Sequence, residues 1–269
     1  MILVNGVADA ALSVRDRGLA YGDGVFRTFP YRDGAPVLWR RQYEKLARDC
    51  RALGIVTPGA DVLERDLRHI TARDCVVKVV VTRGESARGY APSRDAQPVR
   101  IVMTSELPAY PAERETAGID VRVCRLKLSH QPRLAGIKHL NRLENVLARA
   151  EWDDPAIAEG LLCDAEGHLI CGTMSNVFLV QLGRLFTPQL YQCGVKGVMR
   201  DLVIDVAEAH RVPVNVDVLT IDQLREADAA FVVNSLIGLW PIASVDGQAL
   251  RSSPLPAQLQ QWIRDAQGT

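Results

Sequence analysis

The residue with the clearest chemical potential in this sequence is Lys138, in the run LAGIKHLNRLENVLAR at residues 134–149. Its apolar neighbours Leu134, Ile137 and Leu140 can shield the amine from water. Desolvation lowers the pKa of a lysine and makes it a usable nucleophile or base. The spacing alone leaves open the alternative that Lys138 is an ordinary solvated surface charge, as most lysines are.

Two further segments carry groups suited to binding. A glycine-rich turn runs directly into an amphipathic segment at residues 194–201, GVKGVMRD. Main-chain N–H groups at the start of a helix attract phosphate, so Gly197, Val198 and Met199 are candidate donors. The run VVNSLIGLWP ends an expected strand with the short polar side chains of Asn234 and Ser235. Strand ends often carry functional groups, but neither pattern is specific by itself.

The elements that position these residues alternate between two kinds of segment. Runs rich in Val, Ile and Thr predict strands at residues 76–82, 99–104, 119–128, 177–180, 185–187 and 229–233. Apolar residues at helical spacing predict helices at 38–53, 141–151 and 198–209, the second with Asn141 as its cap. Strands and helices mix without a strict β–α–β repeat, so we expect an α+β fold.

A proline-containing stretch at residues 107–118 favours two domains. We expect a smaller N-terminal domain over residues 1–115 and a larger C-terminal domain over 116–269 that carries most of the binding groups. The expected strand at 119–128 can pair with either domain, which leaves the boundary uncertain by about a dozen residues.

Composition argues against several classes of partner. The 269 residues carry 32 basic and 32 acidic side chains, so the formal net charge is zero. Nucleic-acid and membrane-surface binding need a basic excess or a concentrated patch. The six cysteines form no C-x-x-C pair, which is typical of reduced thiols rather than of a zinc or redox motif. With no visible secretion signal or membrane-spanning stretch, we expect a cytoplasmic protein without a metal centre and without nucleic-acid or membrane partners.

Several motifs, in their order along the chain, resemble one family. The run GIKHLNRLENVLAR is similar to the segment with the cofactor lysine in fold-type IV pyridoxal 5'-phosphate enzymes, the class IV aminotransferase group. The runs YGDGVF, TRGESARGY, GTMSNVF and GVKGVMR resemble further signatures of that family. The resemblance extends from about Asn5 to Pro241 and is strongest to its aminodeoxychorismate lyases. It implies the two-domain architecture of D-amino-acid aminotransferases, a pyridoxal 5'-phosphate cofactor, a small-molecule substrate and a homodimer.

The resemblance also implies roles for single residues. Lys138 corresponds to the lysine that binds the cofactor covalently and acts as the catalytic base. Thr28 corresponds to a threonine that faces the substrate, although an ordinary strand residue is an equal alternative. Groups expected at the cofactor belong to Asn176, Gly197, Val198, Met199, Ser235 and Leu236. Groups expected at the substrate belong to Arg83, Arg88, Tyr90 and Asn234, with a surface position as the alternative for either arginine.

Two cofactor-binding positions depart from the family pattern. Lys45 stands where members usually have an arginine for the phosphate, and a lysine keeps the charge but loses the bidentate geometry. Cys171 stands five residues before Asn176, where members usually have a glutamate that pairs with the pyridine nitrogen. A thiol is a weak hydrogen-bond partner, so a less electron-withdrawing cofactor ring is expected. The alternative is that Cys171 is buried packing and another group serves the nitrogen.

The activity that the resemblance implies is the conversion of 4-amino-4-deoxychorismate to 4-aminobenzoate and pyruvate, in folate biosynthesis. Lys138 removes the substrate's α-proton as a positioned base, and loss of the enolpyruvyl group leaves an aromatic product. One alternative is a D-amino-acid or branched-chain aminotransferase, which the fold alone does not distinguish. A second is a catalytically decayed cofactor-binding homologue, suggested by Cys171.

Overall fold

The computed structural model describes residues 1–93 and 95–267, and the chain divides into two compact units. Unit 1 comprises Met1–Pro108 and Ile137–Asn141, and unit 2 comprises Ala109–Gly136 and Arg142–Thr269. The predicted division after residue 115 differs from this one in two places: residues 109–115 belong to unit 2, and the five residues Ile137–Asn141 belong to unit 1. Among the described helices, none combines the length and apolar character that a membrane span needs.

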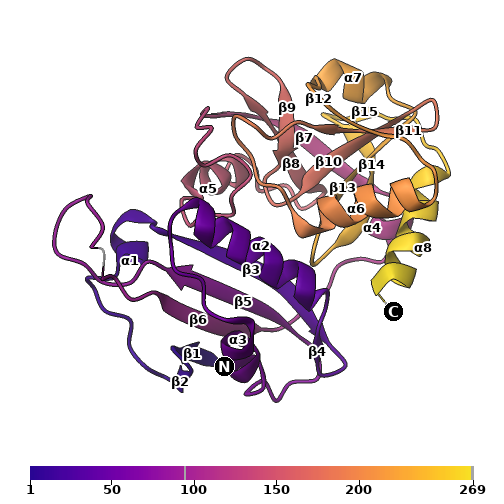
Figure 1. Cartoon of the computed structure of the whole chain (residues 1–269). Coiled ribbons are helices and arrows are strands. Elements are labelled where there is room, and N and C mark those ends of the chain that lie inside the picture. The colour runs from indigo at the N-terminus through magenta and orange to yellow at the C-terminus, as the bar shows by residue number, and fades with distance from the viewer. Residues whose placement is uncertain (94, 268–269) are drawn as a thin grey trace. The chain divides into compact units, whose positions relative to one another are not determined.

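Unit 1 is built on one antiparallel sheet covered by helices (Figure 1). Its strands are β1 (Ile2–Val4), β2 (Val7–Ala8), β3 (Gly24–Arg32), β4 (Ala35–Pro36), β5 (Cys75–Thr82) and β6 (Val99–Ser105). Its helices are α1 (Arg17–Tyr21), α2 (Trp39–Ala52) and α3 (Ala60–Leu67). The strand order is β2-β1-β6-β5-β3-β4, so β6 and β5 lie in the middle and the long strand β3 lies between β5 and the short edge strand β4.

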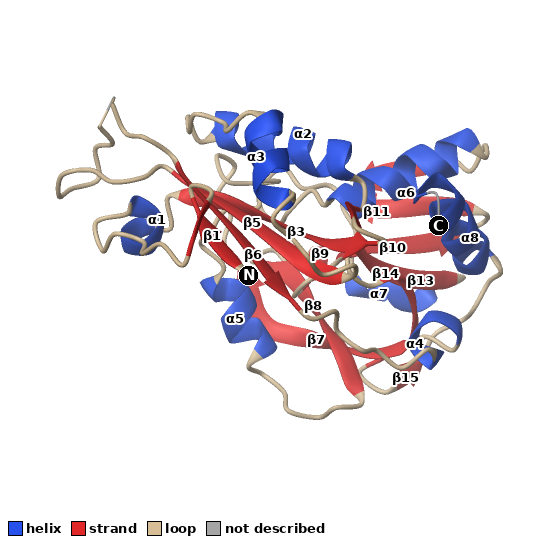
Figure 2. Ribbon diagram, turned by 90° about the horizontal axis from the view of Figure 1, so that it is seen from below, coloured by secondary structure: helices blue, strands red, loops and turns tan. Residues whose placement is uncertain are grey.

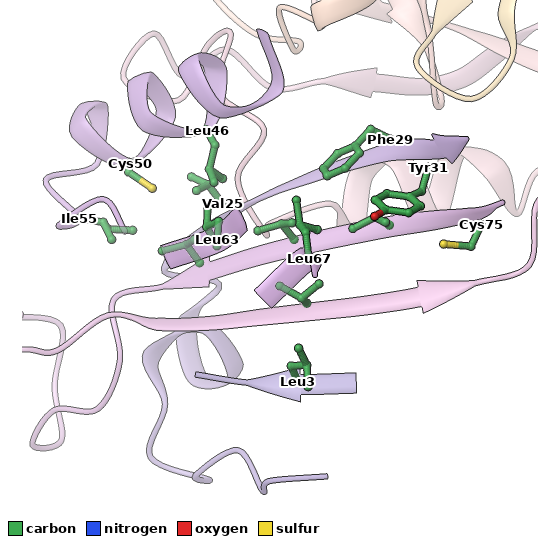
Figure 3. Close-up of a cluster of buried hydrophobic side chains, with 14 of the residues drawn as sticks. Leu3, Val25, Phe29, Tyr31, Leu46, Cys50, Ile55, Leu63, Leu67 and Cys75 are labelled. Atoms are coloured by element: carbon green, nitrogen blue, oxygen red, sulfur yellow. The ribbon is translucent and has the colours of Figure 1, made fainter. Parts of the chain in front are cut away.

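The core of unit 1 lies between this sheet and its helices. Alternate residues of β3 point to one face, and Val25 and Phe29 on that face are fully buried. Leu46 and Cys50 of α2 are one helical turn apart and pack in the same apolar cluster (Figure 3). Ile137 belongs to this cluster as well, which anchors the segment that contains Lys138.

Unit 2 is built on a mixed sheet in the order β12-β11-β10-β13-β14-β7-β8-β9, with β15 paired to β14. Its strands are β7 (Ile119–Leu128), β8 (Ile157–Asp164), β9 (Leu169–Gly172), β10 (Asn176–Gln181), β11 (Arg184–Pro188), β12 (Val214–Asp217), β13 (Ala229–Asn234), β14 (Gly238–Val245) and β15 (Gln248–Ala249). Its helices are α4 (Glu113–Thr116), α5 (Leu143–Arg149), α6 (Val198–Ala209), α7 (Ile221–Glu226) and α8 (Leu255–Gln267). Helices α6 and α8 lie side by side (Figure 2), and the ring of His210, at the C-terminal end of α6, stacks on that of Trp262 in α8 with centroids 3.9 Å apart.

The predicted α+β class is confirmed, as are the predicted strands and helices, within a few residues at their ends. Strand β7 pairs with β14 and β8, so it belongs to unit 2. The predicted cap of α5 is wrong. The helix begins at Leu143 with Arg142 at its N-cap position, and the Asn141 side chain donates instead to the carbonyl of Gly22 at 3.2 Å.

Replacing Phe29 with alanine is expected to lower the free energy of unfolding by about 3–5 kcal/mol, because a buried ring is lost and a cavity remains. Urea unfolding followed by tryptophan fluorescence measures the loss, since the Trp39 ring lies 5.9 Å from Phe29. Val56→Ala is the control, because Val56 is 70% exposed, and it should change stability by less than about 0.5 kcal/mol. Equal losses in both variants would contradict the assigned core.

Candidate active site

Main-chain hydrogen bonds fix the backbone around Lys138 in unit 1. The N–H of Phe26 donates to the Lys138 carbonyl at 3.0 Å, and the N–H of Leu140 donates to the Gly24 carbonyl at 3.0 Å. His139, between the two, forms an antiparallel bridge with Val25. The segment therefore runs beside β3 like a short additional strand, which removes backbone freedom from the lysine.

The Lys138 side chain is half-buried against an aromatic ring. Its Nζ lies 4.6 Å from the centroid of Phe26, a distance at which a cation is attracted to the ring face. The amine of Lys78 lies 5.0 Å from the same centroid. Because side chains alternate along a strand, Thr28 is on the same face of β3 as Phe26, opposite Lys78 in the register. The structure thus places Thr28 on the face that carries Phe26, and its role remains a prediction.

Lys45 is buried in a group of charged residues on the face of α2 that packs against β3. It donates a short hydrogen bond to Asp49, one helical turn later. The other oxygen of Asp49 accepts from the backbone N–H of Lys138 at 3.2 Å and lies 3.5 Å from a guanidinium nitrogen of Arg27. We refer to Arg27, Lys45, Asp49 and Lys138 as the Asp49 cluster.

Burial lowers the pKa of Lys45 to about 8, although the charge of Asp49 opposes the shift. The nearby Arg27 lowers the pKa further. The cationic position that the sequence assigns to the phosphate is therefore coupled to the backbone of Lys138 through one carboxylate. Asp49 and Arg27 were missed from the sequence. The four-residue spacing of Lys45 and Asp49 was the available signal, but it does not show that the pair is buried.

In unit 2, the candidate phosphate-binding turn lies at the start of α6, with Gly197 at the N-cap position. The side chain of Asn176 accepts from the Gly197 N–H at 3.1 Å and donates to the Val195 carbonyl at 2.8 Å. A Cβ atom at Gly197 would lie 2.4 Å from the Asn176 oxygen, so this close approach requires glycine. The first N–H groups of a helix lack intrahelical acceptors, so those of Val198 and Met199 suit an anion.

The same turn is bonded to the residue that precedes the lysine segment. The N–H of Gly136 donates to the Gly194 carbonyl at 2.9 Å, and the N–H of Lys196 donates to the Gly136 carbonyl at 3.1 Å. Gly136 has a positive φ of 78° and Gly194 one of 82°, a conformation that glycine adopts without strain. Gly136, two residues before Lys138, is thus hydrogen-bonded to the candidate phosphate-binding turn.

A buried carboxylate that the sequence did not reveal shapes the loop before Asn176. Glu159 of β8 is only 1% exposed. One of its oxygens accepts from the N–H and the hydroxyl of Thr173 at 3.0 and 2.5 Å. The other accepts from the Met174 N–H at 3.2 Å and the Ser175 hydroxyl at 2.7 Å. Both oxygens are thus engaged in holding residues 173–175, the turn that leads into Asn176.

The turn after β13 engages two of the predicted groups in its own hydrogen bonds. The Asn234 side chain donates to the Met174 carbonyl at 3.2 Å and accepts from the N–H groups of Leu236 and Ile237 at 2.8 and 3.0 Å. Asn234 therefore closes this turn in the structure, and the Leu236 N–H expected at the phosphate points to it. Ser235, between them, is half-buried.

The structure gives Arg83 a role in holding the YGDG turn. Its guanidinium donates to both oxygens of Asp23, at 2.7 and 3.0 Å, and to the carbonyls of Leu53 and Gly54. Burial raises the pKa of Asp23, but hydrogen bonds from Arg83 and Arg17 outweigh this and hold the pKa below its usual value. The sequence showed the arginine and not its partner.

Arg88 and Tyr90 lie apart from these contacts. Arg88 is exposed and lines a cavity of about 420 Å³ together with Arg15, Tyr21 and Ser86. Tyr90 is 86% exposed, its carbonyl accepts from buried Arg17, and its ring lies 5.6 Å from that of Tyr21. Of the two predicted arginines, Arg88 is thus the one that borders an open space.

Cys171 of β9 is 5% exposed and packs in an apolar cluster with Leu162 and Trp152. It also interacts electrostatically with Arg142. Burial lowers the pKa of that guanidinium, and the charges of Cys171 and Glu144 oppose the shift. The surroundings of this thiol therefore combine apolar packing with one buried cation.

Comparison with known proteins places these features in a family. The family profile for class IV amino-transferases matches residues 24–245. This chain belongs to the class IV aminotransferase family. It is 44% identical to 4-amino-4-deoxychorismate lyase from Pseudomonas aeruginosa, over 98% of both chains and with a TM-score of 0.94. It is 33% identical to aminodeoxychorismate lyase from Vibrio harveyi, over 91% of each chain.

Aminotransferases are also among the relatives, and a putative branched-chain-amino-acid aminotransferase from Methanocaldococcus jannaschii is 32% identical over 91% of this chain and 86% of its own. The branched-chain amino acid aminotransferase of Escherichia coli is 26% identical, covers 97% of this chain and 92% of its own, and has a TM-score of 0.84. The D-alanine aminotransferase of Listeria monocytogenes is 28% identical over 95% of this chain and 90% of its own.

Replacing Asn176 with alanine is expected to loosen the turn before α6, because it leaves the Gly197 N–H and the Val195 carbonyl without their present partner. The loss of unfolding free energy should be about 1–3 kcal/mol, with weaker binding of pyridoxal 5'-phosphate in a titration. Asn215→Ala, on exposed β12, is the matched control and should leave both quantities unchanged. An Asn176→Ala protein that matches this control would contradict the assigned role.

Proposed function

We propose that this chain is a pyridoxal 5'-phosphate-dependent lyase that converts 4-amino-4-deoxychorismate to 4-aminobenzoate and pyruvate. The observation that carries the proposal is the 44% identity, over 98% of both chains, to a structure named as this lyase. The aminotransferases compared above share 26–32% identity, less than the 44% shared with that lyase, so they support the fold and the family more than the reaction.

The residues present fit the cofactor. An aldehyde requires an accessible amine, and Lys138 offers one on a fixed backbone beside Phe26. A phosphate requires N–H donors, and the first N–H groups of α6, after the N-cap residue Gly197, offer them. We propose that Lys138 holds the cofactor covalently and that Gly197, Val198, Met199 and Ser235 hold its phosphate. The N–H groups of Gly197 and Leu236 can take part only by sharing or releasing their bonds to Asn176 and Asn234.

When bound, the cofactor supplies a ring that stores the electron pair left by removal of the substrate's α-proton. Lys138 supplies the base, because its Nζ accepts that proton once the amine is neutral. The Phe26 ring covers one side of the amine and excludes water there. Thr28, on the same face of β3, offers a hydroxyl for positioning the substrate or handling the proton.

The thiol at position 171 bears on which reaction this chain supports. We propose that Cys171 faces the pyridine nitrogen and holds its proton less firmly than a carboxylate would. The ring would then store the electron pair less well. An elimination that ends in an aromatic product has a large driving force of its own, so it tolerates this change better than transamination does.

We also propose that the chain is a cytoplasmic homodimer. All six cysteines are free and buried, which suits a reducing compartment. Helix α5 exposes Leu143, Val146 and Leu147 by 67, 60 and 53%, at spacings that put all three on one face. Such an apolar stripe on an amphipathic helix supports contact with another protein surface.

The reaction is tested by incubating the purified protein and pyridoxal 5'-phosphate with 4-amino-4-deoxychorismate. We expect 4-aminobenzoate and pyruvate in equal amounts, little exchange between amino and keto acids, and a visible absorbance from lysine-bound cofactor. Lys138→Ala should lose both the absorbance and the product. Lys78→Ala is the matched control, because its amine contacts the same Phe26 ring, and it should keep both.

Strong transamination without the arylamine product would overturn the lyase proposal in favour of an aminotransferase. A wild-type protein that binds the cofactor but catalyses neither reaction would support the decayed cofactor-binding homologue instead. If Cys171→Glu increased transamination at the expense of elimination, it would agree with the role proposed for the thiol.

The dimer is tested by light scattering after size-exclusion chromatography. Leu147→Asp is expected to shift the mass toward that of a monomer, because it places a charge in the exposed apolar stripe of α5. Leu182→Asp is the control, since Leu182 is 87% exposed elsewhere in unit 2. A monomeric wild-type protein, or no change on Leu147→Asp, would contradict the proposed interface.

A further inference from the structure

Asp49 holds together groups from three separate parts of unit 1. It lies on α2 and is 2% exposed. One carboxylate oxygen accepts from the ammonium group of Lys45, one helical turn earlier. The other accepts from the backbone N–H of Lys138 and pairs with Arg27 of β3. Buried carboxylates need such partners, since an unpaired buried charge is strongly destabilising.

The contact with Lys138 completes the hydrogen bonding of the lysine segment. The Lys138 carbonyl is bonded to Phe26 and the Leu140 N–H to Gly24, both of β3. The Lys138 N–H donates instead to the carboxylate of Asp49. A side chain of α2, and not the main chain of β3, is therefore the acceptor for this N–H. The orientation of the peptide that carries the proposed catalytic amine thus depends on this carboxylate.

We infer that Asp49 is a positioning residue that couples the two lysines of the site. One oxygen keeps the Lys45 ammonium in place for the cofactor phosphate, and the other fixes the Lys138 backbone for covalent attachment. The inference rests on the proposed function, because it assigns purposes to Lys45 and Lys138 that only a bound cofactor gives them. It adds a residue that contacts neither the reacting atoms nor the cofactor.

The charges around Lys45 make the coupling measurable through pH. Lys45 is faced by Asp49 and Arg48 on its own helix and by Arg27 on β3. Burial and the two arginines favour the neutral amine, whereas Asp49 favours the ammonium, and the pKa of Lys45 is about 8. Removing the negative charge of Asp49 removes an influence that raises this pKa, while burial and the two arginines still lower it. Lys45 should then lose its proton, and its attraction for phosphate, at lower pH.

The test is a titration of wild-type and variant proteins with pyridoxal 5'-phosphate from pH 6 to 10, followed by the visible absorbance of lysine-bound cofactor. In the wild type, affinity should fall as the pH rises through about 8. In Asp49→Asn, the fall should begin at lower pH, and affinity at neutral pH should be weaker by roughly tenfold to a hundredfold, since a charge-assisted hydrogen bond is lost. In Lys45→Arg, the fall attributable to position 45 should disappear, because a guanidinium stays charged throughout.

Asp66→Asn is the control for the loss of a buried carboxylate. Asp66 is also in unit 1, is 3% exposed and pairs with Arg100 at 2.6 Å. We expect this variant to keep the wild-type affinity and pH profile even if its unfolding free energy falls as much as that of Asp49→Asn.

The possible failures are distinguishable. If Asp49→Asn matches the wild type and Asp66→Asn in both affinity and pH profile, the inference is overturned while the proposed function stands. If Asp49→Asn does not fold, Lys45→Arg decides, because an unchanged alkaline fall in that variant removes the role assigned to Lys45 and with it the coupling. If the wild type shows no cofactor absorbance that depends on Lys138, the proposed function itself fails.

Discussion

The attachment of residues 137–141 to β3 is the constraint on which the rest of the site depends. Two main-chain hydrogen bonds of 3.0 Å and the burial of Ile137 hold this segment against the sheet of unit 1. A lysine has a long flexible side chain, and fixing its backbone reduces the entropy lost when the amine is held in one place. The fold thus supplies a positioned amine before any ligand binds, which is what a base acting at a defined proton requires.

Charged side chains are buried close together beside this segment. Arg27 and Lys45 share the buried carboxylate of Asp49. Burial lowers the pKa of Lys45 to about 8, Asp49 opposes this shift and Arg27 adds to it. The candidate phosphate-binding turn of unit 2 offers main-chain groups instead, since the first N–H groups of α6 lack intrahelical acceptors. The charge of Lys45 depends on pH, whereas main-chain N–H groups do not titrate.

Sequence reasoning recovered the elements and the local motifs, but not the partners of buried polar groups. Helix α6 and Gly197 were predictable because a glycine before an amphipathic run is a local pattern. Lys138 was singled out through motif resemblance, since its spacing alone is ordinary. Asp49 and Glu159 were missed because their roles arise from contacts with distant or irregular segments. Arg83 was assigned to the substrate for the same reason, as the sequence does not show that Asp23 receives its guanidinium.

The most direct test of the account is to identify the lysine that holds the cofactor. The protein is incubated with pyridoxal 5'-phosphate, the bond is reduced with borohydride, and the modified residue is located by peptide mass spectrometry. The account predicts stoichiometric modification of Lys138, with Lys45, Lys78 and Lys196 unmodified. Modification of another lysine in place of Lys138, or of none, would contradict it.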